Sequence, residues 1–107
     1  MELIDKVKRF REVANELADL YEQKNHNYGD SFGKLYADLG PISGLVPLHN
    51  KLDRVTNLIK GDVNHFESID DSFKDMACYA IMNVIEMEQY NKAKQEEEEE
   101  DQYARDR

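Results

Sequence analysis

The chain has few of the residues that cross-link or interrupt a fold. Its 107 residues include one cysteine, two prolines, five glycines and no tryptophan. The single cysteine, Cys78, cannot form a disulfide within one chain, which suits a reducing compartment. A chain of this length can bury a hydrophobic core without a disulfide or structural metal, and its length predicts a single domain.

Long apolar runs and the signatures of several enzyme classes are also missing. No segment approaches the roughly 18 apolar residues of a membrane span, and Met1–Asp5 lacks the apolar core of a signal peptide. We therefore expect a soluble, cytoplasmic protein without a membrane partner. There is no Walker loop, no G-x-S-x-G and no dinucleotide fingerprint. The three histidines are too scattered for a zinc site.

Positive charge is in deficit. Lysine and arginine number 14 against 23 aspartates and glutamates, for a formal net charge of -9. Because such a surface repels nucleic-acid backbones, no nucleic-acid partner is expected. Glu96–Asp101 is a run of six acids, so the rest of the chain is only mildly acidic. We expect a single helical domain over residues 1–94 and an acidic tail over 95–107, either a solvated helix end or a disordered segment.

Helical periodicity is present throughout the remainder, and no alternation typical of strands accompanies it. The sequence predicts an all-α fold, a compact bundle of about four helices with long first and last helices. The last helix carries an apolar surface over residues 69–88 that is wide enough for a subunit interface, so a homo-oligomer is expected. The predicted segments are residues 2–25; a short helix capped by Asp30 or Ser31 and stopped at Gly40, with Phe32, Leu35 and Leu39 facing inward; a loop at 40–47 followed by a helix to Lys60; and, after a connector at 62–67, a helix from Ser68.

An unusual polar and aromatic cluster lies where the first helix is expected to end. Gly29 with its neighbours can serve as a helix C-cap followed by an N-cap. Capping accounts less well for Lys24, Asn25 and Tyr28. The alternative is ligand binding, in which Tyr28 stacks on a base while Asn25, His26 and Ser31 form hydrogen bonds.

Two cations follow on the third helix. Lys51 and Arg54 are three residues apart and share one helix face, and His49 lies near the predicted beginning of that helix. Such a group either clamps a phosphate or pairs with acids on other helices. The spacing leaves both alternatives open.

Two acids open the last helix. Asp71 and Asp75 are four residues apart, so their carboxylates share a face, and Glu67 precedes them. The pair would repel unless a cation neutralised it. That cation is either Mg²⁺, which prefers carboxylate oxygens, or Lys51 or Arg54. Ion pairing is the commoner role for acids at a helix N-terminus.

These three motifs together resemble a known family, the nucleotide modification associated domain of the first type. The residues that carry the resemblance are Lys24-Asn25-x-x-Tyr28-Gly29-Asp30-Ser31-Phe32, then Lys51-Leu52-x-Arg54, then Glu67-Ser68-Ile69-x-Asp71-x-x-x-Asp75. The family is a small all-α domain found largely in phages and prophages, and the resemblance covers about residues 3–90. It implies nucleotide chemistry in a bacterial host cell, without fixing a reaction. The site residues that the spacing and the resemblance together suggest are Lys24, Asn25, Tyr28, Ser31, His49, Lys51 and Arg54 for a nucleotide, and Glu67, Asp71 and Asp75 for a metal or a ribose.

A more distant similarity is to the MazG-like all-α nucleotide pyrophosphohydrolases, which bind Mg²⁺ through an E-x-x-E helix and an E-x-x-D helix. Asp75 resembles the aspartate of the second motif, but its partner acid is displaced to Asp71. The first motif has no clean counterpart; Glu12 with Glu16, and Asp19 with Glu22, are only candidates. This departure favours binding over catalysis.

Three functions follow from these patterns. The first is a phage-type nucleotide-binding protein that captures a nucleotide, such as a host signalling nucleotide, in counter-defence, with Mg²⁺ as the one candidate cofactor. The second is a Mg²⁺-dependent pyrophosphohydrolase of MazG-like type. The third is an acidic interaction protein without a small ligand, whose tail mimics nucleic acid.

Overall fold

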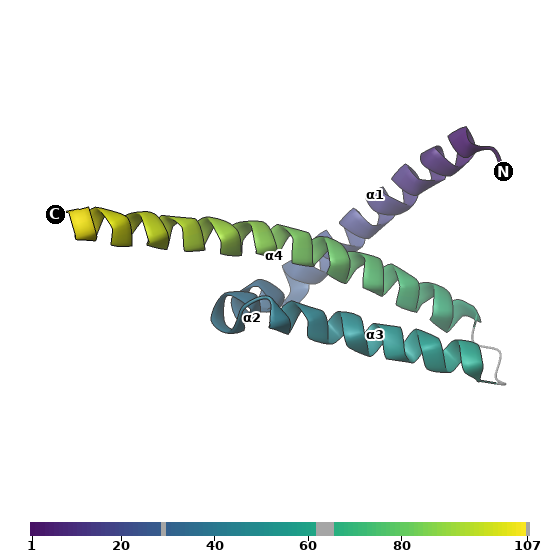
Figure 1. Ribbon diagram of the computed structural model, residues 1–107. Coiled ribbons are helices and arrows are strands. Elements are labelled where there is room, and N and C mark those ends of the chain that lie inside the picture. The colour runs from purple at the N-terminus through teal and green to yellow at the C-terminus, as the bar shows by residue number, and fades with distance from the viewer. Residues whose placement is uncertain (29, 62–65, 107) are drawn as a thin grey trace. The chain divides into compact units, whose positions relative to one another are not determined.

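Four α-helices make up the described part of the chain, and no strand occurs in it (Figure 1). The computed structural model describes residues 1–28, 30–61 and 66–106, apart from the side chains of residues 27–28 and 66–68. The predicted all-α fold with long first and last helices is confirmed. The chain divides into two units, residues 1–31 and 32–107, which are described separately below. The helices are α1 (Leu3–Tyr28), α2 (Ser31–Leu39), α3 (Ile42–Lys60) and α4 (Phe66–Asp106).

Helix α1 forms the first unit and is longer than predicted. It continues to Tyr28 instead of ending at residue 25, because no glycine or proline interrupts the backbone in between. On its exposed face Arg9 binds Glu12 at 3.2 Å and Glu16 at 3.1 Å. These charge-assisted hydrogen bonds to Glu16 and Glu12 raise the pKa of Arg9.

A single turn at Gly40 joins α2 to α3. Gly40 adopts a φ of +83°, which favours glycine, and its N–H donates to the Tyr36 carbonyl at 2.7 Å. The Ser43 hydroxyl then donates to the Gly40 carbonyl at 2.8 Å. The predicted loop at 40–47 is therefore wrong beyond residue 41, because α3 begins at Ile42 and contains Pro47.

Helices α3 and α4 run antiparallel as a hairpin (Figure 1). Val55 of α3 and Ser72 of α4 are both buried. The Asn83 amide donates to the carbonyls of Gly44, at 3.0 Å, and Tyr79, at 2.7 Å. A Cβ on Gly44 would overlap Asn83 Oδ1 and lie 2.8 Å from a Tyr36 ring carbon. Gly44 is thus required by close helix packing, and it does not mark a loop.

Helix α2 packs on α4 through aromatic rings. Tyr36 is 1% exposed and donates its hydroxyl to Met87 Sδ at 3.7 Å. Its ring lies 6.1 Å from Phe32 and 6.2 Å from Tyr90, measured between centroids. The inward face of α2 is therefore centred on Phe32 and Tyr36, and the prediction that the face also includes two leucines is wrong. The residues concerned, Leu35 and Leu39, are both exposed.

Helix α4 is the longest element of the protein. It begins at Phe66, two residues before the predicted Ser68; the rest of the predicted connector, residues 62–65, lies outside the described residues. Residues 91–106 are helical and exposed. Part of the apolar surface of residues 69–88 is also exposed, including Phe73, Ile81 and Val84. The homo-oligomer expected from that surface stays a prediction. None of the described helices is both long and apolar enough to cross a membrane.

Candidate functional site

The α3–α4 hairpin brings together one cation and one acid of the predicted site. Lys51 Nζ lies 3.1 Å from Asp75 Oδ2, and these side chains are only 28% and 30% exposed. Asp75 therefore has, in Lys51, one of the two cationic partners that the sequence suggested among the side chains. Because both side chains are mostly covered, the pair holds the ammonium at a fixed place on the hairpin.

Arg54 and Asp71 lie beside this ion pair. Lys51 faces Asp75, and Gly44 faces Asn83 further along, so the antiparallel register places Arg54 at the level of Ser72 and Phe73, next to Asp71 in the chain. Both side chains are exposed, and neither has a hydrogen-bond or ion-pair partner among the described residues. A guanidinium and a carboxylate that are both open to solvent can bind a phosphate and a hydroxyl group respectively.

His49 is exposed near the middle of α3. Its Nε2 lies 3.4 Å from Asp53 Oδ2, one turn along the same helix. This contact is ionic only when the imidazole is protonated. The contact occupies one ring nitrogen of His49 and leaves Nδ1 for a ligand.

The residues of the first predicted motif belong to the other unit. Lys24 is exposed and Asn25 is half-buried in the last turns of α1, and Ser31 is exposed at the first position of α2. The side chain of Tyr28 lies outside the described residues. Whether this motif shares a ligand with Lys51 and Arg54 stays a prediction.

The predicted metal ligands do not form a cluster among the described residues. Within residues 1–28, 30–61 and 66–106, no three histidine, cysteine, aspartate or glutamate side chains gather where they could hold a metal ion. Asp75 is engaged by Lys51, and the side chain of Glu67 is outside the description. Glu12 and Glu16, candidates for the first acidic motif of a pyrophosphohydrolase, both bind Arg9.

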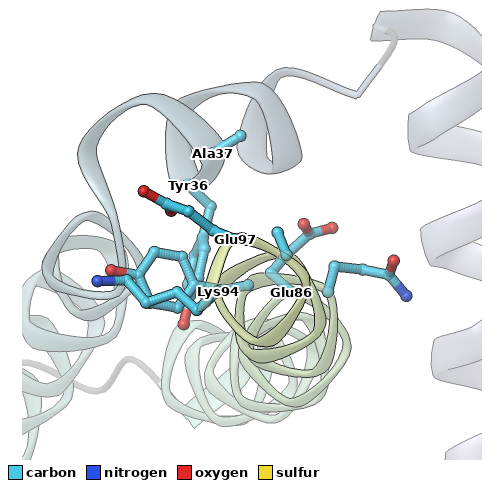
Figure 2. A pocket seen from close by; sticks show the side chains of 8 residues that line it. Tyr36, Ala37, Glu86, Lys94 and Glu97 are labelled. Atoms are coloured by element: carbon cyan, nitrogen blue, oxygen red, sulfur yellow. The ribbon is translucent and has the colours of Figure 1, made fainter. Parts of the chain in front are cut away.

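A hollow between α2 and α4 was not anticipated from the sequence. Its volume is about 470 Å³, within the range of small-molecule sites. Figure 2 shows Tyr36 reaching from α2 toward α4, with Glu86 and Glu97 on either side. Lys94 lies over the ring of Tyr90, 5.4 Å from its centroid. Burial, the Glu86 charge and Tyr90 together raise the pKa of Tyr36.

Only one part of this hollow had a sequence signal. Tyr90 and Lys94 are four residues apart on α4 and therefore neighbours on its surface. Tyr36 lies on another helix more than fifty residues away, and no periodicity connects two such positions.

Comparison with known proteins finds a family match that covers helix α3 and the first part of α4. Residues 24–87, well over half of the chain, match the family described as nucleotide modification associated domain 1. The chain belongs to this family. No curated protein and no solved structure matches the chain significantly. The nucleotide modification associated domain 1 region includes Lys51, Arg54, Asp71 and Asp75, and it ends at Met87, before most of the residues that line the hollow.

Proposed function

We propose that the protein captures a nucleotide through its phosphates at the α3–α4 hairpin and releases it chemically unchanged. The proposal rests on the exposure of Arg54 and on its position in the hairpin. Arg54 is exposed, has no partner among the described residues, lies one turn from Lys51, and falls within the family match. A guanidinium offers paired N–H donors that fit two phosphate oxygens. On a chain with a net charge of -9, an anionic ligand requires such a local cation.

The neighbouring groups support the same ligand. Lys51 lies on the same face as Arg54. Its charge is offset by Asp75 at 3.1 Å, but its ammonium has further N–H groups that can donate to the same phosphate. Asp71 presents a free carboxylate among the described residues, and a carboxylate accepts hydrogen bonds from the hydroxyls of a ribose. Phosphate and sugar would thus be bound by residues of two adjacent helices.

Binding without turnover is favoured over pyrophosphohydrolysis by one group of contacts. A pyrophosphohydrolase needs clustered carboxylates for Mg²⁺. Here Asp75 is neutralised by Lys51, and Glu12 and Glu16 are bound by Arg9. Capture of an intact nucleotide is the behaviour of a protein that sequesters a host signalling nucleotide, and counter-defence is the role that we propose for it.

The test is calorimetric titration of the full chain with nucleoside mono- and triphosphates and with cyclic dinucleotides. Arg54→Ala is expected to lower the affinity for the nucleotide that binds most tightly by about ten-fold or more. The reason is that a charge-assisted phosphate contact contributes roughly 1.5–3 kcal/mol. Arg54→Lys should recover only part of the affinity, because an ammonium cannot bind bidentately. Lys60→Ala removes an exposed cation from the end of the same helix and is the matched control.

The same samples separate capture from catalysis. Ligand recovered after incubation with Mg²⁺ should be intact by chromatography, and EDTA should leave the affinity unchanged. Release of pyrophosphate or a monophosphate, abolished by both Asp71→Asn and Asp75→Asn, would establish the hydrolase instead. If no nucleotide binds, or if Arg54→Ala and Lys60→Ala behave alike, the proposed function is wrong.

A further inference from the structure

A shallow groove, open to solvent and lined by tyrosine rings and carboxylates, runs along the outer part of α4. The hollow between α2 and α4 adjoins a second one of about 620 Å³, and both are lined by Ala93 and Glu97. Tyr90 and Tyr103 contribute ring surface, one in each hollow. Glu100 adds a further carboxylate to the walls. The groove therefore fits an elongated partner that is apolar along its centre and positively charged at its edges.

Repulsion among the acids of the groove also destabilises this part of α4, and a cationic partner would relieve that repulsion. Residues 96–101 are six consecutive acids, yet they are helical and exposed. Like charges three and four residues apart repel each other on a helix surface. Cations lying alongside would replace this repulsion with attraction.

The N-terminal part of α1 has the complementary surface. Leu3, Ile4 and Phe10 are 75%, 78% and 76% exposed. At 100° per residue these side chains form one stripe, with Lys6 at one edge and Lys8 at the other. Arg11 lies within the stripe, whereas Arg9 points to the opposite side, where it binds Glu12 and Glu16.

The two surfaces are also equal in length and opposite in charge. The cations occupy residues 6–11 and the acids occupy residues 96–101. Each segment is six residues long and spans about 9 Å of helix. The cationic segment carries the exposed Phe10 between its charges, and the acidic segment is flanked by Ala93 and Tyr103.

We propose that two copies of the chain associate, with the cationic stripe of α1 from each copy lying in the acidic groove of α4 of the other. Such an arrangement is two-fold symmetric, so both pairs of surfaces are satisfied at once. In this arrangement that contact, and not the apolar surface of residues 69–88, holds the homo-oligomer together, and it does not depend on the proposed nucleotide binding.

The experiment is a charge swap on the full chain. One variant carries Lys6→Glu, Lys8→Glu and Arg11→Glu. The other carries Glu96→Lys, Glu97→Lys, Glu99→Lys and Glu100→Lys, which reverses the four acids that line the second hollow. Arg9 is left unchanged because it pairs within its own helix. Light scattering at micromolar concentration gives the mass, and circular dichroism confirms that each variant is helical.

Wild type should have a mass of about 25 kDa at low salt, twice the 12.5 kDa of one chain. It should shift toward the monomer in 1 M salt, where charges are screened beyond about 3 Å. Each variant alone should be a monomer, because its facing segments carry the same sign. An equimolar mixture should regain the dimer, because each α1 then meets a groove of opposite sign.

A control variant with Lys34→Glu and Lys60→Glu reverses exposed cations outside both segments and should stay dimeric. The proposal is overturned if wild type is monomeric at low salt up to 100 times the working concentration. It is also overturned if either charge-reversed variant stays dimeric, or if the mixture of folded variants does not associate.

Discussion

Replacing Gly44 by alanine should destabilise the protein, although alanine is the better helix former. Gly44 lies inside α3, and a Cβ there would overlap Asn83 Oδ1 and lie 2.8 Å from Tyr36. Overpacking of this kind costs about 1–3 kcal/mol, and alanine returns about 1 kcal/mol of helix propensity. Displacing Asn83 would also weaken its bond to the Gly44 carbonyl, worth about 1 kcal/mol. We expect a net loss of about 1–3 kcal/mol in the free energy of unfolding.

The assay is urea denaturation followed by circular dichroism, in a cycle with Asn83→Ala. That second change removes two hydrogen bonds, at 3.0 and 2.7 Å, but it also vacates the space that the new methyl group needs. Gly44→Ala should therefore cost at least about 1 kcal/mol less in the Asn83→Ala background than in wild type. If Gly44→Ala is stabilising, or if the two changes are simply additive, the close approach of α3 and α4 at Gly44 does not exist in solution.

Three further predictions concern the hairpin, the tail and Tyr36. A double-mutant cycle of Lys51→Ala and Asp75→Asn should give a coupling energy of about 1 kcal/mol in the free energy of unfolding, as expected for a partly covered ion pair; a value near zero would mean that the pair is not formed. Truncation after Lys94 should leave nucleotide affinity and the melting of the hairpin unchanged while abolishing the dimer, as measured by calorimetry and light scattering. Because its raised pKa favours the neutral phenol in the folded state, Tyr36 should contribute stability that is present below about pH 10 and lost as the pH rises through the folded pKa. The alkaline decline in melting temperature should be smaller in Tyr36→Phe, and an equal decline would exclude this origin.

The sequence by itself determined the fold class and several helix ends. Apolar residues at three- and four-residue spacing produce helices and exclude a sheet, because the two structures need different periods. Gly40 and Gly61 mark the ends of α2 and α3, as predicted. These are local properties of the backbone, so they can be read without knowing what packs where. The three polar motifs likewise predicted the family, which the match over residues 24–87 confirms.

Sequence reasoning failed where a residue serves a distant neighbour. Gly44 and Pro47 were interpreted as loop residues, yet both are inside α3. The reason for the glycine is Asn83, almost forty residues away. The side chain of Leu35 is predicted to face the core, but Tyr36 and its aromatic neighbours form the face of α2 that contacts α4. Helical periodicity shows that a face is apolar, but it does not say which part of that face another helix covers.

In the candidate site, too, the sequence shows the charges and the tertiary structure decides how they pair. The charges of Lys51, Arg54, Asp71 and Asp75 were visible in the sequence, and their spacing placed each pair on one helix face. Only the antiparallel register of α3 and α4 decided that Lys51 meets Asp75 at 3.1 Å while Arg54 is left open to solvent. An ion pair forms only when the charged atoms come within about 4 Å, so which cation is engaged and which can bind a ligand depends on that tertiary register.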